Sequence, residues 1–322
     1  MSISERDLAS LERTADDRFH VGADGVRAIT ATGDRRVEWV TFAGHTLACV
    51  RSSMGYPAYY PVHPVRVERP VEAVLMDLDG TTVHSESFWM SMIEQTTATV
   101  LGQPSFTVDG DDLPHVSGHS VSEHLQYCLA KYAPQATLEE ARAHYFSIVR
   151  REMREILEGR GRADAFLPAE GLKEFLLALK EMNVRIALVT SGLYEKAYPA
   201  IVAAFRAMEM GRPEDFYDVI ITAGFPLGEG AAGTMGELSL KPHPWLYAEA
   251  ARVGLGIPFE RRHQVVGIED SSAGICALRL AGFAPIGIAG GNIEQSGARE
   301  LCHVYCQDFT EVLDLIQRGP LS

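Results

Sequence analysis

The chain reads Val71-Glu-Ala-Val-Leu-Met-Asp77-Leu-Asp79-Gly80-Thr81, an apolar run that stops abruptly at two aspartates and a glycine. This pattern predicts a buried parallel strand that ends in a turn. In extended geometry Asp77 and Asp79 point the same way, so their charges repel unless a cation lies between them. Because Mg²⁺ prefers carboxylate and backbone oxygens, the pair indicates a metal site. Gly80 allows a tight turn whose amides face an anion. Taken alone, a simple Asx-type turn explains the stretch equally well.

The composition narrows the classes of protein. The chain has 322 residues, of which 46% are hydrophobic and 22% charged, as in a globular protein of one large or two ordinary domains. A net charge of −14 argues against nucleic acid or an anionic membrane as partner. No apolar run approaches the roughly 18–20 residues of a membrane span, and the N-terminus lacks a signal-peptide pattern. The five cysteines are scattered and odd in number, which disfavours a disulfide framework. We therefore expect a cytoplasmic protein.

Strand-like and helix-like stretches alternate from residue 167 onward. Apolar runs end in Thr190-Ser191 and in Glu269-Asp270, with helical stretches between them. This repetition predicts an α/β fold with a doubly wound parallel sheet, of which the strand before Asp77 is the first member. Residues 87–166 interrupt the alternation with helical patterns only, so we interpret them as an inserted, all-helical cap domain.

The N-terminal region has a different pattern. Residues 1–17 favour a polar helix, and short β-like runs separated by Gly and Asp follow. We interpret the region as a small β-rich scaffold or dimerisation extension without a chemical motif. The alternative is a flap over the active site, with Tyr59, Tyr60 and His63 as substrate contacts. The predicted boundaries are 1–70 for the extension, 71–86 and 167–322 for the catalytic core, and 87–166 for the cap.

Polar residues follow three separate strands of the predicted sheet, and a lysine opens a helix between the last two. They are Asp77 and Asp79, Thr190 and Ser191, Glu269 and Asp270, and Lys241. The carboxyl ends of the strands of a doubly wound sheet form one crevice, so we expect these side chains to converge. Helix capping could explain single members. It does not explain four acids, two hydroxyls and one lysine together.

These residues resemble the four motifs of the haloacid dehalogenase superfamily of aspartate-nucleophile phosphohydrolases. The motifs occur in order as Asp77-Leu-Asp79-Gly-Thr, Val189-Thr190-Ser191-Gly, Lys241-Pro-His-Pro and Gly267-Ile-Glu269-Asp270-Ser-Ser-Ala-Gly. The resemblance covers about residues 71–315 and implies a Rossmann-like core. The Glu-Asp form of the last motif and the helical cap are similar to the branch that contains β-phosphoglucomutase and phosphoglycolate phosphatase.

The resemblance implies a role for each residue. Asp77 would attack phosphorus to form an aspartyl phosphate, and Asp79 would serve as general acid and base. The implied Mg²⁺ ligands are Asp77, the backbone carbonyl of Asp79, Glu269 and Asp270. The implied phosphate-binding residues are Gly80, Thr190, Ser191 and Lys241, which would contact the oxygens where charge develops. In the cap, His119 and Ser120 would contact the substrate.

Several alternatives compete with a phosphatase. Haloacid dehalogenases lack an acid at the position of Asp79, and phosphonate cleavage needs a cap lysine, whereas Lys131 lies past the substrate loop. A β-phosphoglucomutase-like mutase is the enzymatic rival, although Val121, Trp89 and Leu193 replace an arginine, a histidine and a lysine of the mutase. A non-catalytic protein that binds ligands in the same crevice is the second alternative. We expect a Mg²⁺-dependent phosphatase of a small phosphorylated metabolite, such as a sugar phosphate, as a monomer or homodimer.

Overall fold

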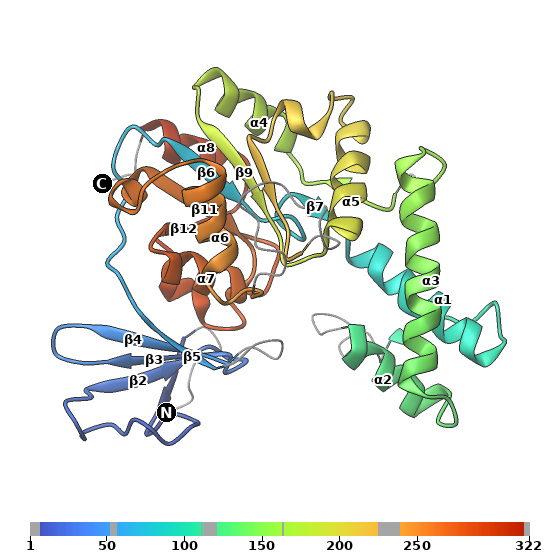
Figure 1. The fold of residues 1–322 in the computed structure, drawn as a ribbon, viewed down its shortest axis with the longest axis horizontal. Coiled ribbons are helices and arrows are strands. Elements are labelled where there is room, and N and C mark those ends of the chain that lie inside the picture. Colours follow the sequence, from blue (N-terminus) through green and yellow to red (C-terminus); the bar gives the residue numbers. More distant parts are fainter. Residues whose placement is uncertain are drawn as a thin grey trace. The chain divides into compact units, whose positions relative to one another are not determined.

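The computed structural model describes residues 7–51, 57–110, 112, 121–162, 164–224 and 239–318 (Figure 1). The chain divides into two compact units. The first consists of Met1–Thr82, Ala169–Ala197 and Gly211–Ser322, and the second of Val83–Pro168 and Tyr198–Met210. The predicted α/β fold with a parallel sheet is confirmed, and so is the β-rich character of the N-terminal region.

The first unit contains a six-stranded parallel sheet in the order β10-β9-β6-β11-β12-β13. Its strands are β6 (Ala73–Met76), β9 (Arg185–Val189), β10 (Val219–Ile221), β11 (Val265–Glu269), β12 (Ala284–Ile288) and β13 (Val304–Cys306). The order reverses between β6 and β11, and ligands of doubly wound proteins bind at the carboxyl ends of the strands at such a point. All four residues of β6 are buried. Burial on both faces explains why the strand is a continuous apolar run.

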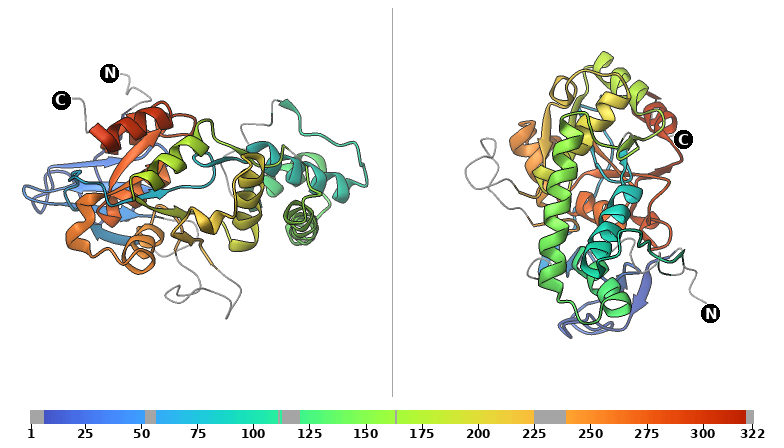
Figure 2. Two further views of the ribbon diagram at one scale, coloured as in Figure 1. Left: turned by 90° about the horizontal axis from the view of Figure 1, so that it is seen from above. Right: turned by 90° about the vertical axis from the view of Figure 1, so that its right-hand side faces the viewer.

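Helices cover both faces of this sheet. The helices α4 (Leu172–Glu181) and α8 (Phe309–Arg318) contact each other on one face. The other face is covered by α6 (Trp245–Glu249), by the π-helical turn Ala250–Gly254 and by α7 (Ser272–Ala281). Figure 2 shows α8 and α6 on opposite sides of the strands. A Cβ at Gly267 of β11 would overlap with the side chain of Leu278, so α7 lies directly against the strand that leads into Glu269.

The N-terminal region forms a five-stranded antiparallel sheet whose strands follow one another in chain order. They are β1 (Ala9–Leu11), β2 (Ala28–Ala31), β3 (Val37–Thr41), β4 (Thr46–Val50) and β5 (Ala58–Pro61). The helix predicted within residues 1–17 is wrong for the residues described there, because Ala9 pairs with Ala31 and Arg13 with His20. Pairing with β2 overrides the local helical preference.

The second unit is mainly helical. It contains α1 (Glu86–Leu101), α2 (Val121–Tyr132), α3 (Leu138–Leu157) and part of α5 (Tyr194–Ala207). A short antiparallel pair, β7 (Val83–His84) with β8 (Leu167–Pro168), joins its two ends. The carboxylate of Asp112 accepts hydrogen bonds from two residues of α2, Tyr127 (2.5 Å) and Lys131 (2.6 Å).

Candidate active site

Three acidic side chains meet where β6 and β11 end. The amide of Asp77 donates to the carbonyl of Ile268 (3.1 Å), so the pairing of β6 with β11 continues up to Asp77. Asp77, Glu269 and Asp270 are all buried, and one carboxylate oxygen from each lies within 4.8 Å of the others. The structure therefore brings together residues from two strands that are adjacent in space and far apart in the sequence.

Lys241 lies at the centre of these acids. Its Nζ donates to Glu269 Oε1 (2.7 Å), to the carbonyl of Val189 (2.9 Å) and to the Asp77 carboxylate. The Lys241 side chain is only 6% exposed. Burial by itself lowers the pKa of Lys241, but the carboxylates of Asp77 and Glu269 outweigh burial and raise it above its ordinary value. Lys241 therefore stays protonated. We call Asp77, Lys241, Glu269 and Asp270 the acid–lysine cluster.

Glu269 is fully buried, and each of its oxygens accepts two hydrogen bonds. Oε1 accepts from Lys241 and from the Tyr247 hydroxyl (2.5 Å), while Oε2 accepts from the amide (3.3 Å) and hydroxyl (2.9 Å) of Ser271. Tyr247 was not among the predicted site residues. It is buried in α6, and Lys241 Nζ lies 4.8 Å from its ring centroid. In the sequence, Tyr247 is simply an aromatic residue on the helix that follows Lys241, and nothing else there indicates a role in the site.

Asp270 is enclosed by two glycines. The backbone of Gly80 has a positive φ of 87°, and a Cβ there would overlap with the Asp270 carboxylate. A Cβ at Gly291 would overlap with the same residue. Thr81 Oγ1 donates to Asp270 Oδ1 (3.1 Å). Burial, followed by the charge of Glu269, raises the pKa of Asp270 to about 7. The close approach at these positions explains the need for glycine.

The acid–lysine cluster fits a divalent cation. Three carboxylates lie together, and one ammonium group, that of Lys241, pairs with two of them. Burial and the charge of Glu269 raise the pKa of Asp77 well above its ordinary value, although Lys241 acts in the opposite direction. The raised pKa values of two adjacent carboxyl groups indicate too little positive charge at this place. Oxygen ligands of this kind suit hard cations such as Mg²⁺.

Three more of the predicted residues, Asp79, Thr190 and Ser191, are described by the structure. Asp79 is exposed, directly after Leu78. Burial lowers the pKa of Lys196 to about 8, and the charges of Glu195 and Asp79 oppose this shift. Thr190 Oγ1 accepts from the Gly192 amide (2.9 Å), and Ser191 Oγ accepts from the Lys241 amide (3.3 Å). The two predicted substrate contacts of the cap, His119 and Ser120, lie outside the described residues.

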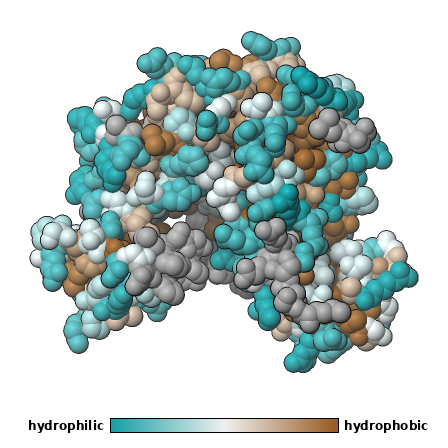
Figure 3. Space-filling view, turned by 180° about the vertical axis from the view of Figure 1, so that it is seen from behind, coloured by the Kyte–Doolittle hydropathy of each residue, from teal (hydrophilic) through white to brown (hydrophobic). Residues whose placement is uncertain are grey.

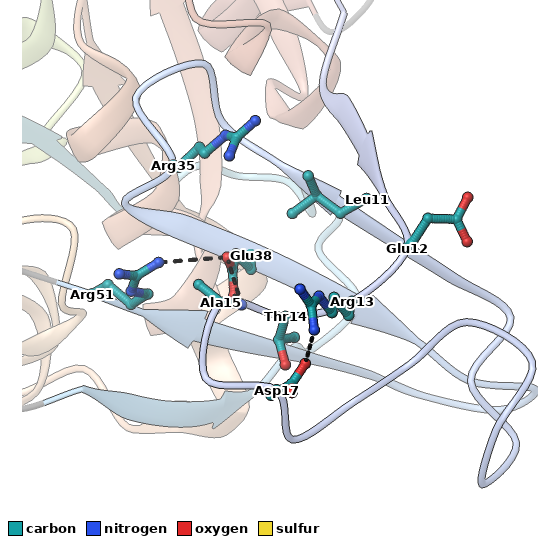
Figure 4. Close-up of a pocket in the computed structure, with 9 residues that line it drawn as sticks. All are labelled: Leu11, Glu12, Arg13, Thr14, Ala15, Asp17, Arg35, Glu38 and Arg51. Atoms are coloured by element: carbon teal, nitrogen blue, oxygen red, sulfur yellow. Dashed lines mark hydrogen bonds and ion pairs between the residues drawn. The ribbon is translucent and has the colours of Figure 1, made fainter.

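A separate hollow lies on the N-terminal sheet (Figure 4). Its volume is about 460 Å³, and it is lined by Leu11, Glu12, Arg13, Thr14, Ala15, Asp17, Arg35, Glu38 and Arg51. The buried Glu38 accepts from the Ala15 amide (3.2 Å) and pairs with Arg51 (3.7 Å). Three arginines balance three acids in the lining. The contacts of Glu38 hold the segment after β1 against β3, which is a structural role.

The fold and the site define a doubly wound α/β protein with a buried acid–lysine cluster at its topological switch point. The family model of haloacid dehalogenase-like hydrolases matches residues 71–282. The chain belongs to this family, and the resemblance predicted from its motifs is confirmed. The search of curated proteins found no match.

Three solved structures illustrate the shared fold. A putative β-phosphoglucomutase from Thermotoga maritima is 19% identical, with a TM-score of 0.56 over 77% of this chain and 100% of that one. A predicted phosphoglycolate phosphatase from Haemophilus somnus is 19% identical, with a TM-score of 0.56 over 76% and 98%. CbbY from Rhodobacter sphaeroides, in complex with phosphate, is 21% identical, with a TM-score of 0.52 over 75% and 96%.

The surface of the described residues is mixed in character. On the face seen in Figure 3, hydrophilic residues predominate and apolar residues are scattered among them. Among the helices that the structure describes, none combines the length and the hydropathy required to cross a membrane.

Proposed function

We propose that this protein is a Mg²⁺-dependent phosphatase that hydrolyses a small phosphorylated metabolite through an aspartyl phosphate on Asp77. The observation that carries the proposal is the contact of Lys241 with both Asp77 and Glu269 at the carboxyl ends of β6 and β11. A buried carboxylate held beside a protonated lysine can approach an anionic phosphate that it would otherwise repel. Two solved structures with this fold are a putative β-phosphoglucomutase and a predicted phosphoglycolate phosphatase.

The first half of the reaction forms the covalent intermediate. A carboxylate oxygen of Asp77 attacks phosphorus, and the bond between phosphorus and the leaving oxygen breaks. Asp79 donates a proton to that leaving oxygen, which departs as an alcohol. Lys241 and the amides after Asp77 hold the equatorial oxygens, where negative charge is concentrated in the transition state.

The second half returns Asp77 to its starting state. Asp79, now deprotonated, takes a proton from a water molecule that attacks the phosphorus of the aspartyl phosphate. The bond between phosphorus and the Asp77 oxygen breaks, and inorganic phosphate leaves. Bound Mg²⁺ would supply positive charge that offsets the repulsion between the carboxylate and the phosphate.

The hydrogen bonds of Glu269 indicate that the two adjacent acids, Glu269 and Asp270, have different roles. Both of its oxygens are already occupied by two donors each. We therefore assign Glu269 to the positioning of Lys241 rather than to the metal. Asp77, the backbone carbonyl of Asp79 and Asp270 are then the proposed ligands. This narrows the ligand set that the family resemblance implied.

Mg²⁺ is expected to raise the melting temperature of the protein, and to raise it more at about pH 8 than at about pH 6. The pKa of Asp270 is raised from 3.8 to about 7, so the folded state without metal retains a proton between these values. Stability contributed by this group therefore falls as the pH rises through 7, and metal binding must displace the proton at lower pH. Thermal melts with and without Mg²⁺ at both pH values measure the effect.

Two matched variants separate the roles of the adjacent acids in the same melts. Asp270→Asn is expected to abolish the stabilisation by Mg²⁺, whereas Glu269→Gln is expected to retain it. An equal loss in both variants would show that Glu269 is a direct ligand. Unchanged stabilisation in Asp270→Asn would place the metal elsewhere.

A phosphate-release screen tests the activity itself. Sugar, nucleotide and small-acid monophosphates are incubated with the full chain and Mg²⁺, and Asp77→Asn serves as the blank. We expect Mg²⁺-dependent release of phosphate from at least one of these classes of monophosphate. A mutase would instead interconvert hexose 1- and 6-phosphates in the presence of a bisphosphate primer, and a binding protein would release no phosphate from any substrate.

A further inference from the structure

The N-terminal sheet packs on a helix of the candidate site. Trp39 of β3 and Val50 of β4 belong to one buried cluster with Cys276 and Leu280 of α7. The strand β11 ends at Glu269, Asp270 follows it, and the helix α7 begins at Ser272 with Ser271 as its N-cap. The family match begins only at residue 71, so this sheet is an addition to the matched core. The added sheet thus touches the element that follows Glu269 and Asp270.

The same sheet also reaches the loop that carries Lys241. The hydroxyl of Tyr60, on β5, lies 2.7 Å from Nδ1 of His243, and the two rings meet edge to face with centroids 5.8 Å apart. The ring of Trp245 also meets the ring of Tyr60 edge to face, with centroids 6.2 Å apart. Burial lowers the pKa of His243, which favours the neutral imidazole that can accept a hydrogen bond from the Tyr60 hydroxyl.

His243 belongs to a tight turn around Lys241. The His243 amide donates to the carbonyl of Leu240 (3.0 Å), and its side chain is buried at 3% exposure. On the other side of the turn, the Lys241 amide donates to Ser191 Oγ (3.3 Å). The turn is therefore held from the core by Ser191 and from the N-terminal sheet by Tyr60. Its position decides where the Lys241 ammonium group meets Asp77.

We propose that the N-terminal sheet positions the lysine of the acid–lysine cluster, with Tyr60 acting through His243 to hold the turn Leu240–His243. The inference rests on the proposed phosphatase function and extends it to a region outside the family match. Tyr60 is a positioning residue, because its hydroxyl is engaged by His243. This assignment replaces the flap, in which Tyr60 would contact the substrate. It also goes beyond an inert scaffold, in which one hydroxyl would not affect turnover.

The test compares Tyr60→Phe with Tyr59→Phe in the full chain. Tyr60→Phe keeps the ring and its packing but removes the hydroxyl. This variant is expected to lower kcat roughly 10-fold, which is the size of effect usual for the loss of a residue that supports a catalytic group. KM should be nearly unchanged, because Tyr60 does not contact the substrate. Tyr59 is the matched control, because neighbouring strand residues point to opposite faces and its hydroxyl donates to Asp16 (2.8 Å). Tyr59→Phe is expected to leave kcat unchanged.

Hydrogen exchange supplies a readout that does not need activity. Amides of residues 239–247 are expected to exchange faster in Tyr60→Phe than in wild type, and not in Tyr59→Phe. In a His243→Leu background, Tyr60→Phe is expected to add no further loss of kcat, since the two residues act through one bond.

The outcomes separate this inference from the proposed function. Wild-type kcat and wild-type exchange in Tyr60→Phe would overturn the positioning role, as would equal effects of the two tyrosine variants or additive losses with His243→Leu. If the wild-type chain releases no phosphate from any substrate, the proposed function fails. The exchange of residues 239–247 then decides whether Tyr60 holds the turn.

Discussion

Asp77→Asn is expected to reduce phosphate release from an aryl phosphate by roughly 10⁴-fold or more, the scale lost when a covalent nucleophile is removed from a hydrolase. The asparagine amide has the shape of the carboxylate but cannot attack phosphorus. Burial and the neighbouring acids raise the pKa of Asp77, so a neutral side chain at this position suits its surroundings. The variant should therefore fold, and phosphate or Mg²⁺ should still bind. Steady-state phosphate release, together with thermal melts, measures both effects.

Asp314→Asn is a suitable control for this substitution. Asp314 is 55% exposed on α8 and pairs only loosely with Arg318 (3.7 Å). The same chemical change there should leave turnover and melting temperature unchanged. Retention of substantial activity in Asp77→Asn, in a preparation free of wild-type enzyme, would exclude Asp77 as the nucleophile.

Lys241→Met is expected to reduce both activity and stability. Lys241 contacts two buried carboxylates, and breaking a buried pair on one side costs on the order of 3–5 kcal/mol. Loss of one donor to the transition state lowers kcat by roughly 10²–10³-fold. Lys241 opposes the rise in the pKa of Asp77, so without the ammonium group this pKa rises further and the folded state binds more protons. The loss of stability should therefore be greater at about pH 8 than at about pH 6. Denaturant unfolding at both pH values measures it.

A surface lysine provides the comparison for Lys241→Met. Lys180 pairs with Asp218 (3.2 Å), and both side chains are about one-third exposed, at 32% and 36%. Exposed pairs contribute roughly 0–1 kcal/mol, so Lys180→Met should change stability little. If Lys241→Met were as stable as wild type at both pH values, the buried carboxylates would not depend on the lysine for their charge.

The sequence predicted the core well because its strands are buried on both faces. Continuous apolar runs such as Ala73–Met76 end in polar residues, and a parallel sheet brings such strand ends to one edge. The N-terminal residues were harder, because Ala9–Leu11 becomes a strand only through pairing with β2. No local pattern in that segment indicates that it pairs with β2.

The missed features of the site depend on contacts that a linear pattern does not contain. Tyr247 could equally have been an ordinary core residue of α6, and only its hydroxyl contact with Glu269 shows its place in the site. In the structure, the carboxylate of Glu269 contacts a lysine, a tyrosine and a serine. The motif alone does not distinguish this positioning role from that of a metal ligand. Tyr60 and His243 are separated by 183 positions in the sequence, and their contact exists only in the folded chain.

The site of phosphorylation during turnover tests the proposed role of Asp77 as nucleophile. The enzyme is mixed with an aryl phosphate and Mg²⁺, quenched in acid within one turnover, digested and analysed by mass spectrometry. We expect one phosphoryl group on Asp77, which is absent in Asp77→Asn and accumulates in Asp79→Asn because the second step needs the general base. A phosphoryl group on any other residue, or turnover with no labelled Asp77 at any quench time, would contradict this role of Asp77.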